Sequence, residues 1–293
     1  MRIGRRLETL LMSPLALLLT ATLVIPAIIL FAYSLFTWIQ LRPQGSLTLD
    51  NYLDVLTGRL YARVAITTLF VAIPTAVLSV VGGYLIAYYA VFVQRRGRSL
   101  MFALIVSAVM ASYLARIFAW RTLLGESGLI NSLLMGIGAI SEPIQVLLFS
   151  RPSAILAMTA LLMPLAALTF YAALSGISSE YRQAARDLGA GPAQTLWRVT
   201  LPLSGPSVLA TTALIFFLAS GDYVTPVLVG GIDTVTVGRL VSDDFGTIGQ
   251  YGIGSAVSFL MLGGFVIVYV ALRMSMRAIG LLPRNTGLGG EQL

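Results

Sequence analysis

Long apolar stretches are the feature of this sequence that most restricts its fold. Each is about as long as the roughly 20 residues that a helix needs to cross a bilayer, and arginine-bearing segments separate them. Only 11% of the 293 residues are charged, whereas a soluble domain carries roughly 25%. Such a chain cannot cover its surface with polar groups, which predicts an all-α membrane protein with a single transmembrane domain of six helices. The expected spans are 14–38, 64–92, 99–120, 152–175, 204–229 and 254–278.

The distribution of arginine predicts the orientation of these spans. With the N-terminus in the cytoplasm, the inner segments carry 12 of the 19 basic residues and four acids, a net charge of +8. The outer segments carry seven basic residues and eight acids, a net charge of −1. Basic residues favour the side that is not translocated, so both termini are expected to be cytoplasmic. The first apolar run is about twice as long as a signal-peptide core, so it is expected to be retained as the first span.

Three residue types are missing, and their absence narrows the chemistry. The chain has no Cys and no His, and all of its basic residues are Arg. A nucleotide-binding P-loop needs a lysine, and His is the commonest general base and metal ligand. The sequence therefore predicts a non-catalytic chain that binds no cofactor. The adjacent acids in SDDFG (242–246) offer a cation or catalytic site, but a solvated turn in an outer loop is the favoured interpretation.

Two outer loops are expected to contain short helices. In residues 39–63, Leu49, Tyr52, Leu53 and Leu56 recur at helical spacing, and residues 121–151 contain the apolar run GLINSLLMGIGAI. Both segments are too short to cross a bilayer, so the sequence predicts surface helices packed at the outer side.

The most polar structured segment lies between the fourth and fifth spans and reads EYRQAARDLGAGPAQTLWRVTLP, residues 180–202. Ser178 or Ser179 is a suitable N-cap for a helix that begins near Glu180. An apolar face is expected from Tyr181, Ala184, Ala185 and Leu188, which follow helical spacing. Gly189 permits a left-handed helix end, and Pro192 suits the first turn of a second helix. The segment is predicted to form a helix–turn–helix on the cytoplasmic face.

This segment resembles the cytoplasmic EAA loop of ABC importer permeases, whose pattern is E-A-A-x3-G-x9-I-x-L-P. Here Gln183-Ala184-Ala185 is followed after three residues by Gly189 and after nine more by Val199-Thr200-Leu201-Pro202. Gln183 stands where the pattern has glutamate and Val199 where it has isoleucine. Glu180 and Asp187, at i−3 and i+4 from Gln183, are able to supply the missing charge. Two further segments, SYLARIFAWRTLLGESGLINSLL and GDYVTPVLVGG, are similar to regions of spermidine/putrescine-type permeases.

The resemblance implies the type I (MetI-like) importer-permease fold in a bacterial inner membrane. It also implies partners: a second permease subunit, two cytoplasmic ATPase subunits that bind ATP and Mg, and an external solute-binding protein. The loop 178–202 would couple this chain to the ATPase through Glu180, Gln183, Ala184, Ala185, Asp187, Gly189, Leu201 and Pro202. The solute would be a polyamine or a related small amine or amino-acid-like compound.

Two ionisable residues lie inside expected spans, Arg116 and Asp222. Charged residues in spans rarely face lipid, and three interpretations stay open. The two side chains pair as an outer gate, or Asp222 meets a cationic solute with Trp120 and Tyr223 as aromatic contacts, or both simply reach interfacial water.

The alternative functions of the chain are a stand-alone secondary transporter or channel and an intramembrane enzyme. The absence of a midplane charge disfavours the transporter, and the absence of His, Cys and Lys disfavours the enzyme.

Overall fold

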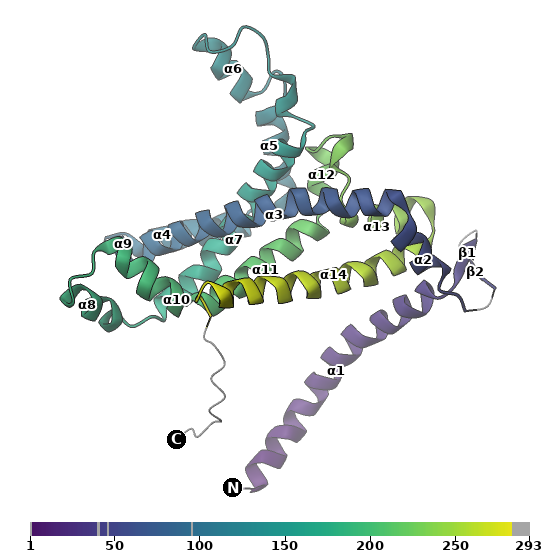
Figure 1. Ribbon diagram of the computed structural model, residues 1–293, viewed down its shortest axis with the longest axis horizontal. Coiled ribbons are helices and arrows are strands. Elements are labelled where there is room, and N and C mark those ends of the chain that lie inside the picture. The colour runs from purple at the N-terminus through teal and green to yellow at the C-terminus, as the bar shows by residue number, and fades with distance from the viewer. Residues whose placement is uncertain (1, 40–41, 46, 95, 283–293) are drawn as a thin grey trace. The chain divides into compact units, whose positions relative to one another are not determined.

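The computed structural model describes residues 2–39, 42–45, 47–94 and 96–282, which are mostly helical (Figure 1). The chain divides into two compact units: residues 1–63 with 240–263, and residues 64–239 with 264–293. Three helices run from one unit into the other: α3 (Arg59–Tyr88), α13 (Val237–Asp243) and α14 (Tyr251–Ala278).

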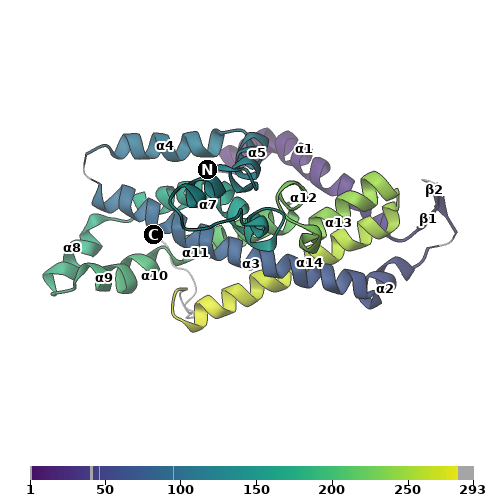
Figure 2. The same cartoon turned by 90° about the horizontal axis from the view of Figure 1, so that it is seen from above.

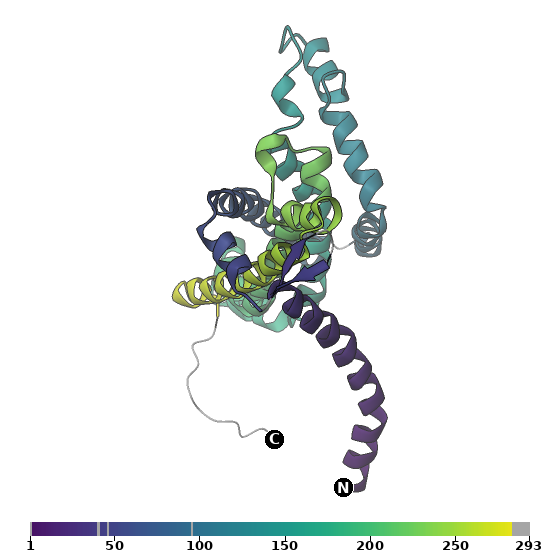
Figure 3. The same cartoon turned by 90° about the vertical axis from the view of Figure 1, so that its right-hand side faces the viewer.

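The first unit contains the N-terminal helix α1 (Arg2–Ser34), a small hairpin and the short helix α2 (Asp50–Thr57). The hairpin pairs β1 (Thr37–Ile39) with β2 (Arg42–Gln44) in antiparallel register and lies at the C-terminal end of α1 (Figure 3). Buried Asn51 fastens α2 to this end of α1, because its side-chain amide donates to the carbonyl oxygens of Ser34 (2.8 Å) and Phe36 (2.9 Å). The short helix predicted around Leu49–Leu56 is therefore confirmed.

The second unit is built around α3, α7 (Arg151–Ser175) and α11 (Gly205–Gly221), which lie together in Figure 2. Their core is fully buried at Val71, Met158, Phe170, Leu174 and Ile215. Helices α3 and α7 approach closely at Gly83, where a Cβ would lie 2.7 Å from the Cβ of Ala166 and from the backbone nitrogen of Ala167. Small residues permit such close contact between membrane helices, where packing drives association.

The remaining elements of the second unit are shorter. The outer-loop helix predicted in residues 121–151 is confirmed as α6. The shorter elements of the second unit are, in chain order, η1 (Tyr89–Val93), α4 (Arg98–Met110), α5 (Tyr113–Leu124), α6 (Leu129–Gly136), η2 (Gln145–Leu147), α8 (Ser179–Asp187), α9 (Pro192–Thr195), η3 (Leu196–Thr200), α10 (Leu201–Leu203), α12 (Val224–Leu228) and η4 (Ile232–Thr234).

Two of the expected spans are not continuous helices. The run 99–120 breaks after Met110, and α4 and α5–α6 meet at 89°. The cause is local: Ala111 is extended, and the Ser112 hydroxyl caps α5 by accepting the backbone N–H of Ala115. The run 204–229 is bent by 73° at its start, after α10, and α11 ends at Gly221, before a separate α12.

Among the described residues, three helices are long and apolar enough to cross a membrane: Arg59–Val93, Arg151–Ser175 and Tyr251–Ala278. The two bent pairs raise that number to five, and a shorter apolar segment, Thr20–Ser34, lies within α1. The fold is that of a mostly helical membrane protein with one small β-hairpin, while the count of six spans and the cytoplasmic termini stay predictions.

Candidate functional site

The polar segment between α7 and α11 forms the predicted helix–turn–helix. The hydroxyl of Ser178 accepts the N–H of Glu180 (3.2 Å) and caps α8. At the other end, Gly189 has a φ of +83°, and its N–H donates to the carbonyl of Arg186 (2.8 Å). The next residue, Ala190, donates to Ala185 (3.0 Å). This left-handed ending satisfies the last carbonyls of the helix and reverses the chain.

The second arm of this segment starts as its residue types predict. Pro192 is the first residue of α9, and the side chain of Gln194 accepts the N–H of Gly191 (3.3 Å). Thr195 is buried, and its hydroxyl donates to the carbonyl of Gly191 (3.0 Å). We call the whole of residues 178–202 the coupling knob. Its helices α8 and α9 lie at the end of the molecule where α3 ends, in both Figure 1 and Figure 2.

The predicted apolar face of α8 is largely uncovered in the described part of the chain: Ala184 is exposed, and Ala185 is partly buried. Tyr181 is 58% exposed and Leu188 is 89% exposed, and Trp197 of the second arm is 66% exposed. The polar residues Glu180, Gln183 and Asp187 are also exposed. Leu201 and Pro202 lie instead at the base of the knob, where Leu201 packs against the main core. The coupling knob thus presents an apolar and charged tip on a packed base.

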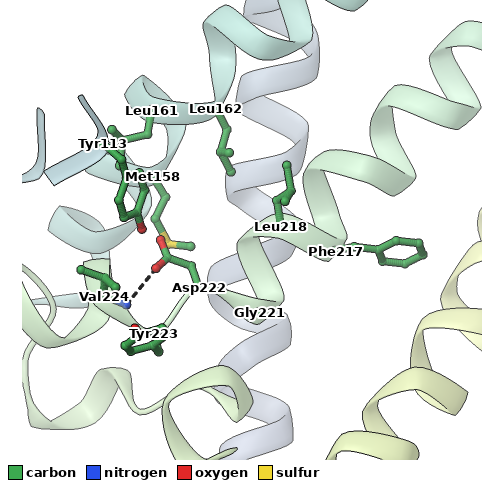
Figure 4. Close-up of a pocket in the computed structure, with 10 residues that line it drawn as sticks. All are labelled: Tyr113, Met158, Leu161, Leu162, Phe217, Leu218, Gly221, Asp222, Tyr223 and Val224. Carbon is green, nitrogen blue, oxygen red and sulfur yellow. Dashed lines mark hydrogen bonds between the residues drawn. The ribbon is translucent and has the colours of Figure 1, made fainter. Parts of the chain in front are cut away.

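A second candidate site is a pocket of about 460 Å³ near the C-terminal end of α11 (Figure 4). In the figure, the side chains of Tyr113 and Met158 lie beside the carboxylate of Asp222, whereas the ring of Phe217 extends away from it. Sequence reasoning identified Asp222 and Tyr223 but not Tyr113 or Met158, because these residues come from distant helices. The lining residues are Tyr113, Met158, Leu161, Leu162, Phe217, Leu218, Gly221, Asp222, Tyr223 and Val224.

Asp222 also has a local structural role at the break between α11 and α12. Its carboxylate accepts the backbone N–H groups of Val224 (2.9 Å) and Thr225 (3.1 Å) and the hydroxyl of Thr225. The Thr225 hydroxyl also contacts that of Tyr113 (3.1 Å). The carboxylate therefore caps α12 in the manner expected at a helix N-terminus, and it holds this turn against α5.

Arg116 and Trp120 lie on α5 but do not line the pocket. Arg116 donates to the carbonyl oxygen of Leu161 (3.2 Å), and its Nε is buried with no hydrogen-bond partner among the described residues. Trp120 packs against the cluster that contains buried Ile117 and Val229. No ion pair joins Arg116 to Asp222 in the described part of this conformation. A gate formed by these two residues therefore stays a prediction that needs another arrangement of the helices.

The acidic pair at 243–244 differs from the expected solvated turn. Asp244 is only 3% exposed and starts η5 (Asp244–Ile248), and its Oδ2 has no hydrogen-bond partner among the described residues. Gly254 lies against its side chain: a Cβ there would be 3.1 Å from the Cβ of Asp244. The described residues contain no group of three or more acidic, His or Cys side chains that could hold a metal ion.

This buried carboxyl is expected to make stability depend on pH. Burial, with a further contribution from Asp243, raises the pKa of Asp244 from 3.8 to about 6. The folded state therefore keeps a proton that the unfolded state loses, so the stabilisation is fully present below about pH 4 and is lost as the pH rises to about 6. We expect the Tm of the purified chain to fall over this interval, and Asp244→Asn to flatten the fall. Exposed Asp54→Asn is the matched control; the same slope in both variants would contradict the assignment.

Comparison with known proteins places the chain among transport permeases. Residues 2–280 match the family described as "Binding-protein-dependent transport system inner membrane component". The chain is 30% identical to the spermidine/putrescine transport system permease protein PotB of Haemophilus influenzae, with 83% of each chain covered. It is 28% identical to PotB of Escherichia coli K12, covering 76% of this chain and 81% of that one.

A solved structure shows the same fold at lower sequence identity. A chain of a bacterial alginate ABC transporter, in complex with an alginate-bound periplasmic protein, superposes with a TM-score of 0.76. The match covers 95% of this chain and 97% of that chain at 17% identity. At this identity the likeness concerns the fold alone.

Proposed function

The chain belongs to the family of binding-protein-dependent transport system inner membrane components and is a permease subunit of an ABC importer; from this premise we propose the following roles for its two sites. The coupling knob receives the movement of a cytoplasmic ATPase, and the pocket at Asp222 lies on the path of a cationic solute of the polyamine class. Membership of this family sets aside the stand-alone transporter and the intramembrane enzyme.

The single observation that carries the coupling role is the uncovered tip of the coupling knob. Tyr181 and Leu188 expose more than half of their surface although α8 is a well-capped helix. The sequence has no lysine and therefore no P-loop of its own, so energy from ATP has to reach it through a protein contact. An exposed aromatic and aliphatic face flanked by Glu180 and Asp187 fits a groove on a partner. The ATPase contributes the nucleotide chemistry and Mg, and this chain contributes the contact.

The proposed solute class rests on two supports. The relatives at 28–30% identity are named for the transport of spermidine and putrescine. Both compounds are cationic amines. The pocket of this chain contains one carboxylate, Asp222, beside the aromatic rings of Tyr113 and Tyr223. A carboxylate attracts an ammonium group, and aromatic faces interact favourably with cations. Arg116 lies on α5 outside the lining of the pocket. It would move to pair with Asp222 when the solute is absent.

We propose further that this chain works beside a second permease. One chain offers one coupling knob, whereas the closure of a pair of ATPase subunits needs two. We therefore place the chain in an assembly of two permeases, two ATPases and an external binding protein, with both termini in the cytoplasm.

Reconstitution in liposomes tests this proposal. The complete set of subunits, with spermidine and putrescine as the probes, is expected to show solute-stimulated ATP hydrolysis and uptake. This chain with the ATPase and binding protein alone is expected to show neither. Uptake by the chain as the only permease would mean a homodimer, and hydrolysis stimulated only by uncharged solutes would overturn the cationic assignment.

A further inference from the structure

One contact of the coupling knob is made with a span that does not adjoin it in sequence. The guanidinium carbon of Arg182, in α8, lies 3.8 Å from the centroid of the Phe92 ring. The Nε of Arg182 is buried and has no hydrogen-bond partner among the described residues. Burial lowers the pKa of Arg182 below its ordinary value, the neighbouring Arg186 lowers it further, and Tyr88 acts in the opposite direction. The face of Phe92 is thus a close partner of this partly desolvated cation.

Phe92 sits where the second long helix ends. The last turn, η1 (Tyr89–Val93), is π-helical, and its closing hydrogen bond runs from the N–H of Gln94 to the carbonyl of Tyr89 (2.9 Å). Turns of this kind are uncommon and occur often at functional positions. The ring of Tyr88 meets that of Phe92 edge-on at 5.2 Å. Both residues pack against the main core of α3, α7 and α11.

The covalent connections of the knob reach only two of these three core helices. The segment before α8 continues from α7, and the arm after α9 leads into α11 through a bend of 73°. Helix α3 has no covalent link to the knob, because 90 positions of sequence separate Phe92 from Arg182. The stack of Arg182 on Phe92 supplies a contact between α8 and the end of α3.

We propose that Arg182 is a positioning residue for coupling: its stack on Phe92 transmits the movement of the coupling knob to the cytoplasmic end of α3, so that all three core helices respond together. This inference rests on the proposed coupling role of the knob. Arg182 does not contact ATP or solute; it acts through Phe92. Without the stack, α8 still docks on the ATPase, but its movement reaches α3 only indirectly, through Ser204 at the start of α11, whose hydroxyl hydrogen-bonds that of Tyr84 in α3 (2.9 Å).

The test uses the complete reconstituted importer and a double-mutant cycle. Arg182→Gln and Phe92→Leu are each expected to lower the solute transported per ATP hydrolysed about fivefold, a value typical of the loss of one well-placed cation–π contact. The double variant is expected to be no worse than either single variant. Phe92→Trp keeps an aromatic face and is expected to retain near wild-type coupling. Arg186→Gln, on the exposed side of the same helix, is the matched control and is expected to change little.

A second measurement is independent of transport. The chain contains no cysteine, so spin labels can be placed on Ser179→Cys in α8 and Val93→Cys in η1, two exposed positions. The distance distribution between them is expected to be narrow in the parent chain and broad in Arg182→Gln. An unchanged width, or normal coupling in both single variants, would overturn the proposal.

Retention of the ATPase separates this inference from the coupling role itself. Arg182→Gln and Phe92→Leu are expected to retain the ATPase in pull-down at the parent level. Loss of the ATPase in these variants would mean that Arg182 serves docking rather than transmission, which would also overturn the proposal. Failure of the parent knob to hold the ATPase would instead refute the coupling role.

Discussion

Replacing Gly189 with valine is expected to lower coupling at least about tenfold while leaving the chain folded in the membrane. Gly189 holds a φ of +83° at the turn between α8 and α9. A residue with a Cβ costs about 1–2 kcal/mol in this left-handed region, and a β-branched residue costs more. Each 1.4 kcal/mol is tenfold in an equilibrium, so the population of the native turn relative to other conformations falls about tenfold. We expect pull-down of the ATPase and solute uptake to fall at least about tenfold.

The glycine two positions further on provides a matched control. Gly191 has an ordinary φ of −69°, and a Cβ at either glycine would meet nothing within 4 Å. Gly191→Ala is therefore expected to behave like the parent, and Gly189→Asn is expected to keep much of the activity because asparagine tolerates the left-handed region. Equal loss in Gly189→Val and Gly191→Ala would point to crowding at the docking surface and not to backbone strain. Full retention of the ATPase by Gly189→Val would refute the role of the turn.

The coupling knob could be predicted from sequence because its determinants are local. A serine cap, a glycine at the helix end and a proline at the next start all lie within 15 residues of one another, from Ser178 to Pro192. The direction in which the arginines of α8 point could not be predicted in the same way. Arg182 belongs to the polar side of the helix by spacing, yet the fold places it on Phe92, 90 residues earlier.

The breaks in two expected spans could not be predicted from hydropathy alone. A hydropathy pattern measures how apolar a stretch is, and it does not register where the backbone hydrogen bonds of a helix stop. The signals were nevertheless present: Ser112 follows an apolar run and caps a new helix, and Asp222 does the same after α11. Reading Asp222 only as a charge inside a span therefore missed its hydrogen bonds to the start of α12. The pocket beside it was also beyond reach, since Tyr113 and Met158 come from α5 and α7.

Asp222 both caps α12 and supplies the carboxylate of the pocket. Two substitutions are expected to separate these roles. Asp222→Asn keeps an oxygen that accepts the N–H groups of Val224 and Thr225, whereas Asp222→Ala removes it. Loss of a cap costs about 1 kcal/mol, so the alanine variant is expected to be less stable and the asparagine variant nearly unchanged in Tm. If the carboxylate attracts a cationic solute, the asparagine variant is still expected to transport about tenfold less, because one contact to a charged group is worth about 1.5–3 kcal/mol.

Three measurements on this variant separate the roles of Asp222. Thermal unfolding reports the cap, basal ATP hydrolysis reports assembly, and uptake of putrescine at low concentration reports the pocket. Glu126→Gln, an exposed carboxyl-to-amide change away from the pocket, is the matched control and is expected to transport normally. If Asp222 serves Arg116 instead of the solute, the exchange of Arg116→Asp with Asp222→Arg is expected to recover part of the activity that each single change removes. Normal uptake by Asp222→Asn would assign the residue to capping alone, because only the amide oxygen is then needed to hold α12 in place.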